Sequence, residues 1–571
     1  MSTRWRPRSL ALMAVTISLF AACGPSDASK SPPGQQSQPA AAPRKIITLG
    51  AQLEPNSLMP TITGGIVGSG GTEVPLMVND TLVLETEFEK YAPELAAELP
   101  SVDKGTWRLN PDGTMDTVWK LRPNTYWHDG TPLTSDDFVF GFAVVTNPDL
   151  GLATATTRLI NSVEVQDAST FTMHWSSVYA EADIRGIFDA LPRHLLGEVY
   201  QQGRDPFLAS PYFTMQFVGL GPYKLANWQV GSQIELARFD QYTRGRPPLD
   251  GIIVRFINDP NTMVAAALAG SVDVILATVS LDAAQQVKQQ WEGTGNQVLI
   301  TPTGSHYVAE VQYRPEYVQP KEVFNNRDVR QAFYQAIDRV SIANAMTNGL
   351  APVADSYYNP TDPNRAAMEQ YIPQYPYDPN RAQALLAQAG WARGSDGIQV
   401  NQQTGARLQT GVWGHPDNPR TQLAQLLANS WTNIGVDVSI NQIPPELIND
   451  REYGATLPGW WVVIPSGRVF YTPPNTLHTK AIPSAANRWN GVNFPGYTNP
   501  KADAIQDRLN ATIDAGQRIA LQQQLVQEFM GDMAVLPLYW QVVPTLIRAG
   551  ITGPRPLRTF PTTNVFTWDR Q

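Results

Sequence analysis

The residues that could do chemistry are too widely spread to form a familiar catalytic motif. The two closest of the six histidines, His174 and His194, are 20 positions apart, and there is no H-E-x-x-H pair for zinc. The patterns G-x-S-x-G, Gly-Lys and G-x-G-x-x-G are absent too, so a hydrolase elbow, a phosphate loop and a dinucleotide fingerprint are all excluded. His128 and Asp129 are adjacent, but neighbours on an Asp-Gly turn point apart. The sequence therefore favours binding over catalysis, with no cofactor and no metal.

Composition limits the class of protein. The chain has 571 residues, of which 42% are hydrophobic and 16% charged, and its length predicts two or more domains. These values exclude an acidic disordered chain, a coiled coil and a fibrous repeat. A net charge of −9 argues against nucleic acid as a partner, because phosphate binding needs clustered Lys and Arg. A single Cys excludes an internal disulfide, an iron–sulfur cluster and a Cys-based zinc site.

That cysteine follows an export pattern. Arg4, Arg6 and Arg8 precede an apolar run over residues 10–20, then two alanines and Cys23. The run is too short for a membrane-spanning helix, which needs about 20 residues. We predict a lipoprotein signal peptide over 1–22, acylation of Cys23 and a flexible Pro/Ser/Gln/Ala-rich tether over 23–43. The alternative is a plain secretory signal followed by an incidental Cys.

The remaining chain alternates between strand-like and helix-like segments, which predicts an α/β protein. Strands are predicted over 45–50, 117–122, 252–257, 436–440 and 535–543. Helices are predicted from Thr134 onward and over 261–269, 328–348, 381–389, 421–434 and 504–533, the last with a break at Gly516. Five tryptophans within apolar patterns are predicted to be core: Trp127, Trp175, Trp228, Trp431 and Trp540.

Six motifs occur in a characteristic order. They are DTVWKLRPNTYWHDGTPLTSDDFVFGF over 116–142, the G-x-G-P-Y segment with its A-G-x-x-D element over 219–273, and shorter matches over 329–339, 377–390, 496–500 and 536–539. Together they resemble the extracytoplasmic solute-binding proteins of ABC importers, in the oligopeptide/dipeptide/nickel-binding class (family 5). This resemblance implies a two-lobed, type II periplasmic-binding-protein-like α/β fold with an extra subdomain in the first lobe.

The resemblance also implies domain boundaries. The core of lobe I would comprise 44–64, 215–300 and 535–571, its extra subdomain 65–214, and lobe II 301–534. The implied function is that of a lipid-anchored, monomeric binding protein that captures a small solute (a peptide, an oligosaccharide or similar) between the lobes and delivers it to a permease with its ATPase. It would lie outside the cytoplasm, on the periplasmic or outer face of the cell membrane. Two alternatives are a glycosidase-like exported hydrolase and a receptor lipoprotein without an importer.

Candidate ligand-binding residues lie in loops at strand ends. Gln52 and Glu54 follow the first strand. Trp413, His415 and Asp417 lie in or after a short strand whose matching loop touches ligand in peptide-binding relatives. Most pockets between lobes are apolar with a few placed polar groups, which suits these residue types.

Two further candidates, Trp460 and Trp461, lie where peptide-binding relatives carry a tryptophan followed by an Asp for the peptide's amine. Residues 453–502 contain no Asp or Glu, so an ammonium group buried there would lack its counter-charge, at a cost of several kcal/mol. We therefore expect a ligand that is not a peptide anchored by its amine there, but a neutral or anionic solute, such as a sugar stacked on one of these rings. The alternative is a carboxylate supplied from elsewhere, for instance by Glu54, Glu73 or Asp417.

Overall fold

The protein is described by a computed structural model that covers residues 44–63, 70–87, 90–184, 187–276, 279–321, 323–465, 476–555 and 562–571. The chain divides into two units after Pro43, and the second unit, Arg44–Gln571, is compact. The predicted signal peptide, the tether and Cys23 lie outside the described residues. Within the described ranges, no helix combines the length and apolar character that crossing a membrane requires.

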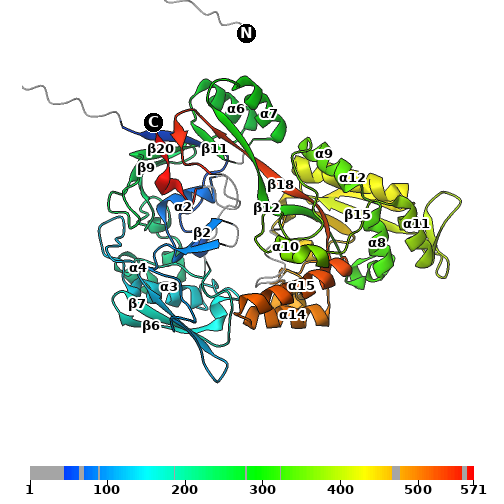
Figure 1. The fold of residues 1–571 in the computed structure, drawn as a ribbon, viewed down its shortest axis with the longest axis horizontal. Helices are drawn as coiled ribbons and strands as arrows, with labels where there is room; N and C mark the ends of the chain where they lie inside the picture. Colours follow the sequence, from blue (N-terminus) through cyan, green and yellow to red (C-terminus); the bar gives the residue numbers. More distant parts are fainter. Residues whose placement is uncertain are drawn as a thin grey trace, which may run out of the picture. The chain divides into compact units, whose positions relative to one another are not determined.

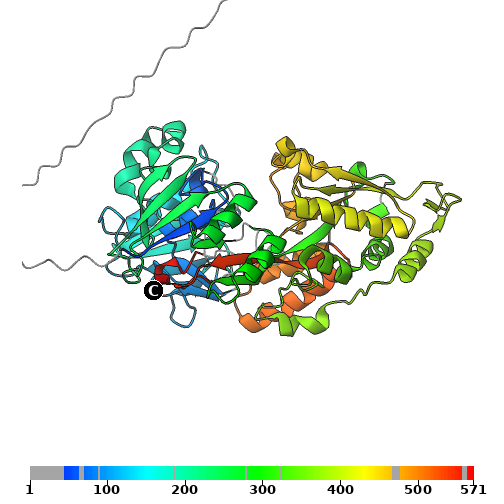
Figure 2. The same ribbon diagram turned by 90° about the horizontal axis from the view of Figure 1, so that it is seen from above.

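One ten-stranded sheet runs through the second unit (Figures 1 and 2). Its order is β16 (Asp437–Gln442), β15 (Gln409–Gly414), β17 (Trp460–Val463), β12 (Gln297–Val311), β18 (Leu536–Ile547), β11 (Val274–Leu276), β1 (Ile46–Ala51), β10 (Gly251–Phe256), β9 (Gln233–Arg238) and β8 (Tyr223–Gln229). β1 pairs in parallel with β10 and β11, and β15 pairs in parallel with β16 and β17. The mixed sheet and its helices confirm the predicted α/β class.

Two long strands join the halves of this sheet. β12 and β18 pair antiparallel from Gln297 opposite Ile547 to Ala309 opposite Leu536, with register shifts between Pro302 and His306 and between Tyr307 and Val308. At one end β18 pairs with β11, and at the other end β12 pairs with β17. The same two strands therefore belong to both halves of the sheet.

A separate four-stranded sheet has the order β4 (Trp107–Leu109), β5 (Met115–Lys120), β7 (Thr170–Trp175) and β6 (Ile160–Asp167). Helix α3 (Ser135–Thr146) begins with the predicted capping box, in which Asp137 accepts the backbone N–H of Thr134 at 3.0 Å. Phe138 of α3 stacks on Phe171 of β7, with ring centroids 4.8 Å apart. Three two-stranded sheets complete the strands: β2 (Val83–Glu87) with β3 (Lys90–Pro93), β13 (Trp391–Arg393) with β14 (Gln399–Asn401), and β19 (Ile551–Thr552) with β20 (Asp569–Arg570).

The remaining α-helices are short to medium in length. They are α1 (Pro60–Thr63), α2 (Glu73–Val78), α4 (Arg193–Gln201), α5 (Arg204–Leu208), α6 (Pro260–Ala269), α7 (Leu281–Gln290), α8 (Arg327–Gln335), α9 (Arg339–Thr347), α10 (Arg365–Met368), α11 (Pro379–Gln388), α12 (Asn418–Asn433), α13 (Arg451–Thr456), α14 (Pro500–Ala511) and α15 (Ala515–Gly531). Helix α6 ends at Gly270, which adopts φ +77° as the predicted C-cap.

Two helix predictions need correction. The segment 328–348 is not one helix but α8 and α9, because the Asp338 side chain accepts the Ser341 N–H at 3.0 Å and starts a new helix. The break within 504–533 lies at 512–514 rather than at Gly516. Asp514 caps α15 by accepting the Gln517 N–H at 2.8 Å, which leaves Gly516 inside the first turn.

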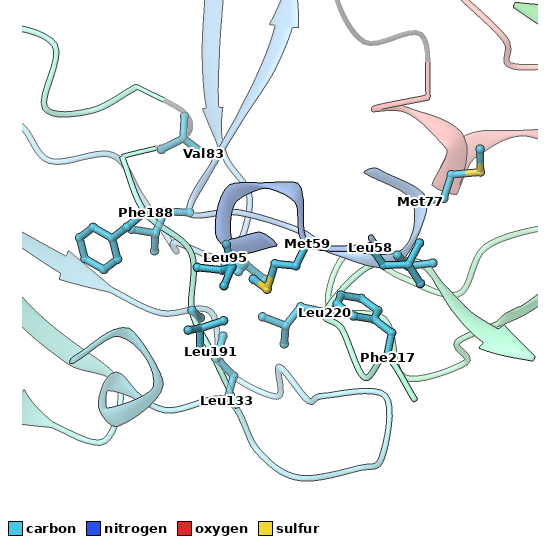
Figure 3. Close-up of a cluster of buried hydrophobic side chains, with 14 of the residues drawn as sticks. Leu58, Met59, Met77, Val83, Leu95, Leu133, Phe188, Leu191, Phe217 and Leu220 are labelled. Atoms are coloured by element: carbon cyan, nitrogen blue, oxygen red, sulfur yellow. The ribbon is translucent and has the colours of Figure 1, made fainter. Parts of the chain in front are cut away.

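Several hydrophobic clusters fill the interior. The largest, here the N-terminal core, takes residues from 47–276 and from 547–568, and Figure 3 shows part of it around Leu58, Met59, Leu95 and Leu191. A second, here the C-terminal core, takes residues from 307–542, and a third lies around α14 and α15. Trp127, Trp175, Trp431 and Trp540 are buried as predicted, whereas Trp228 is only half-buried. The predicted lobe boundaries stay predictions.

Candidate functional site

The first group of predicted residues lies at the end of β1. The Glu54 carboxylate accepts the indole N–H of Trp228 at 2.6 Å and the backbone N–H of Gly231 at 2.9 Å. Gln52 donates through Nε2 to the carbonyl of Asn258 at 3.3 Å. Glu54 therefore holds the β8–β9 hairpin against the end of β1, and Trp228, predicted to be core, is half-buried at this contact.

Glu73 lies nearby in sequence, at the first turn of α2. Its side chain accepts the Gly70 N–H at 2.7 Å, and only 8% of the residue is exposed. Burial raises the pKa of Glu73 to about 7, and the hydrogen bond from Gly70 opposes that rise. At neutral pH this carboxyl group is therefore partly protonated.

The second group follows β15 and begins α12. Asp417 caps the helix by accepting the Arg420 N–H at 2.9 Å, and its other oxygen pairs with Nε of Arg420 at 2.5 Å. His415 is half-buried, and its pKa is lowered first by burial and then by the Arg420 charge, so the imidazole is neutral at neutral pH. Trp413 donates its indole N–H to the carbonyl of Pro458 at 2.8 Å.

Two tyrosines add to this second group. Tyr307 on β12 stacks on Tyr539 on β18, with centroids 4.7 Å apart and an interplanar angle of 25°. Burial and, to a lesser extent, the Asp417 charge raise the pKa of Tyr307 to about 12, and the Arg420 charge opposes this rise, so both charges lie within electrostatic range of the ring. Burial, Tyr307 and Asp417 likewise raise the pKa of Tyr539. We call His415, Asp417, Arg420, Tyr307 and Tyr539 the β15 cluster.

Sequence reasoning did not find three members of the β15 cluster. Arg420 stands three positions after Asp417, a spacing that brings two side chains together on a helix, and this could have drawn attention to it. Tyr307 and Tyr539 lie in mainly apolar strand patterns, and only the register between β12 and β18 brings them face to face.

The third group, Trp460 and Trp461, occupies opposite faces of β17, since successive side chains alternate along a strand. Trp460 is 0% exposed and stacks on Phe333 at 5.3 Å within the C-terminal core. Trp461 is 4% exposed and packs in a small cluster with Ile443 and Leu457. This placement does not support a sugar stacked on Trp460, and protein side chains already cover Trp461.

An acidic residue that sequence reasoning missed lies beside Trp461. Glu310 on β12 pairs directly opposite Trp461 on β17, and only 7% of the residue is exposed. Burial raises the pKa of Glu310 to about 7, and a hydrogen bond from the Trp461 side chain opposes the rise. The available signal was one acid inside a β-branched and aromatic run over 306–313.

The pair His128–Asp129 is structural, as its turn predicted. His128 accepts the Gly219 N–H through Nδ1 at 3.1 Å, while its Nε2 lies 3.0 Å from the Gly221 carbonyl. Burial lowers the pKa of His128 to about 4. Asp129 pairs instead with Nε2 of His194 at 2.7 Å, so the two neighbours do not act on a common atom.

Two pockets lie apart from the predicted residues, and the first includes Gln409 and Thr410 at the start of β15. One, of about 320 Å³, is lined by Gln409, Thr410 and Asp437 among others, and one of about 470 Å³ is lined by Lys321, Trp391 and Asn401 among others. Gln319 lines both pockets, and neither contains a predicted site residue. Among the residues that the structure covers, no group of three or more His, Cys, Asp or Glu is arranged to hold a metal.

Comparisons with known proteins identify the kind of chain. The family described as "Bacterial extracellular solute-binding proteins, family 5 Middle" matches residues 90–479. The oligopeptide-binding protein AppA of Bacillus subtilis is 24% identical over 444 residues, which cover 75% of this chain and 76% of that protein. Heme-binding protein A of Haemophilus influenzae is 25% identical over 399 residues, covering 64% of this chain and 68% of that protein.

Solved structures show the same fold. NikZ from Campylobacter jejuni in complex with Ni(L-His) has a TM-score of 0.72 at 20% identity, covering 93% of this chain and 100% of that chain. The oligopeptide-binding protein of Thermus thermophilus, complexed with a pentapeptide, has a TM-score of 0.72 at 22% identity, covering 92% and 96%. The predicted two-lobed, type II periplasmic-binding-protein fold is confirmed.

Proposed function

The chain belongs to family 5 of the bacterial extracellular solute-binding proteins, and we propose that it captures one small solute between its two lobes while lipid-anchored outside the membrane. As a member of this family it is an extracytoplasmic substrate-binding protein of an ABC importer, working with a permease and an ATPase, and it is not an enzyme. The prediction of a binding protein is thereby confirmed over that of an exported hydrolase.

The position of β12 and β18 supports the proposal that a solute is captured between the lobes. These two strands belong to both halves of the sheet, so bending them moves one half relative to the other. Ligands of open α/β sheets bind outside the carboxyl ends of the parallel strands. Those ends carry Gln52 and Glu54 after β1 and the residues His415 and Asp417 after β15.

The charges of the predicted residues favour a solute that is neutral or anionic. Three carboxyl groups were alternatives for pairing with a ligand ammonium, and each is engaged: Glu54 with Trp228, Glu73 with Gly70 and Asp417 with Arg420. Arg420 pairs with Asp417 through Nε, but a quarter of its side chain is exposed, so its Nη groups can still face a ligand beside the neutral His415. We therefore propose that the solute is not anchored through a primary amine, and that an anionic or hydrogen-bonding group faces Arg420.

The names of relatives do not decide the ligand. They include an oligopeptide-binding protein and a heme-binding protein, so the same fold serves different solutes. A peptide remains compatible with our proposal where its backbone or its carboxylate, rather than its amine, provides the anchor.

Matched pairs of ligands test the solute class. Isothermal titration of the full chain would compare free-amine peptides with their N-acetylated forms, beside oligosaccharides and anionic solutes. We expect acetylation to change the affinity by less than about tenfold. A peptide bound at micromolar affinity or better, and lost on acetylation, would contradict the proposal.

Matched variants test the role of the β15 cluster. We expect Arg420→Met to weaken binding of the identified ligand, and Arg381→Met, on the exposed face of α11, to leave it unchanged. If the Arg420→Met variant binds the ligand as tightly as the Arg381→Met variant does, Arg420 does not contribute to the binding site.

Lipid anchoring is tested at Cys23. We expect wild-type chain in the membrane fraction with the mass of added acyl chains, and Cys23→Ser chain released from it, because two or more acyl chains anchor firmly. A wild-type chain without added mass would contradict the anchor and leave the binding function untouched.

A further inference from the structure

A second contact joins regions of the chain that belong to different hydrophobic cores. The turn between α14 and α15 contacts the loop that follows β7 (Figure 1). Helices α14 and α15 build their own cluster with Leu509 and Leu521, whereas Tyr179 in the loop belongs to the N-terminal core. We call this junction, between residues 509–518 and 179–181, the hairpin contact.

An apolar side chain takes part in the hairpin contact. Ile513, in the turn between the two helices, packs against the N-terminal core. On the other side Tyr179 is buried and stacks on Trp175, with centroids 5.5 Å apart and an interplanar angle of 27°. The Tyr179 backbone N–H also donates to Sδ of Met115 at 3.4 Å, so this side of the contact is firmly held.

Polar interactions join the same two segments. The backbone N–H of Ala180 donates to the carbonyl of Asn510 at 2.8 Å. Arg518 donates from Nη1 to the carbonyls of Leu509 at 2.9 Å and Thr512 at 3.1 Å, and from Nη2 to the Glu181 carboxylate. The side chains of Arg518 and Glu181 are only 16% and 10% exposed, so this is not a solvated surface pair.

The hairpin contact is separate from the strands β12 and β18, which join the two halves of the ten-stranded sheet. Its residues lie on the turn after α14 and the loop after β7, and neither segment belongs to the ten-stranded sheet. If β12 and β18 were the one connection between the lobes, one lobe could both bend and twist relative to the other. A lobe that is also held at the hairpin contact can only rotate about the line that joins the two connections.

We propose that the hairpin contact is a pivot that confines the movement of the two lobes to one axis. Through it, the strand ends after β1 and β15 return to the same alignment each time the lobes close. Without it, β12 and β18 would also twist, and the two groups of ligand-facing residues would lose their register. The proposal rests on the two-lobed binding function argued above, but it makes predictions about the protein without ligand.

Distances between spin labels on the two lobes test the pivot. The chain has one cysteine, so a full chain with Cys23→Ser can carry labels at Leu195→Cys on α4 and Val340→Cys on α9, whose residues are 42% and 60% exposed. The test variants are Glu181→Gln and Arg518→Met. The matched control is Lys501→Met, which removes an ion pair to Glu528 between the same two helices without touching the loop after β7.

We expect the label distances in the ligand-free protein to broaden in Glu181→Gln and Arg518→Met and to stay unchanged in Lys501→Met. Removing one partner of a buried ion pair should raise the detached population about tenfold or more. If Arg518→Met does not fold, Ile513→Ser disrupts the same contact with its charges intact and should broaden the distances as well. Distributions that match Lys501→Met in all test variants would overturn the pivot. This measurement needs no ligand, so its failure is distinct from a failure to bind solute.

Discussion

The buried carboxyl group of Glu310 makes a prediction that can be worked out from the structure. Its pKa rises from 4.5 to about 7 because the residue is buried on β12 opposite Trp461, which corresponds to about 3 kcal/mol of free energy. The folded chain holds this proton more tightly than the unfolded chain does. The contribution of the protonated Glu310 to the free energy of unfolding is therefore complete below pH 4.5, and it is lost as the pH rises through about 7.

Replacing Glu310 by glutamine, its neutral isostere, removes the cost of ionising a buried carboxyl group at high pH. Glu310→Gln keeps an oxygen to accept the Trp461 indole N–H but cannot ionise. We expect it to match the wild type near pH 4.5 and to exceed it by up to about 3 kcal/mol in the free energy of unfolding above pH 8. Glu73, whose pKa is raised in the same direction, contributes equally to both proteins, so the difference isolates Glu310.

Urea unfolding at a series of pH values, followed by tryptophan fluorescence, measures the difference. The matched control is Glu292→Gln, which removes an exposed carboxylate and should not produce a pH-dependent gain. A Glu310→Gln protein that is no more stable than the wild type above pH 8 would refute the reasoning, because Glu310 would then ionise in the folded chain at little cost.

Three further predictions follow from the same structure. Trp460→Ala should lower the free energy of unfolding by about 3–5 kcal/mol in urea titration, because its ring fills the C-terminal core against Phe333. Asp338→Ala should cost about 1 kcal/mol in the same assay, because α9 loses the cap that receives the Ser341 N–H. Burial and the Arg420 charge lower the pKa of His415 below its usual 6.5. Solute affinity, measured by calorimetry, should therefore stay constant from neutral to mildly alkaline pH and change only below pH 6.5. A change in affinity centred above pH 6.5 would contradict the lowered pKa.

Local rules predicted the elements whose signals are contained within a few residues. The capping box of Thr134 and Asp137 started α3 where expected, and Gly270 ended α6. The same rules failed where two signals compete. The apolar spacing over 328–348 continues through Asp338, yet the cap formed by that residue divides the segment into α8 and α9.

The candidate site depends on register, which the sequence does not specify. The sequence does not indicate which of Trp460 and Trp461 faces the C-terminal core. The pairing of β17 with β12 places Trp460 there. The same pairing places Glu310 beside Trp461, although the two residues are 151 positions apart. Sequence reasoning could name the loop after β15, but it could not bring Tyr307 and Tyr539 to it.

Native mass spectrometry of the exported full chain tests the central claim, that the protein binds one small solute, most directly. Our account predicts one small-molecule adduct per chain, lost on denaturation, whose mass identifies the ligand. A chain that remains bare after incubation with peptides, oligosaccharides and anionic solutes would contradict the account.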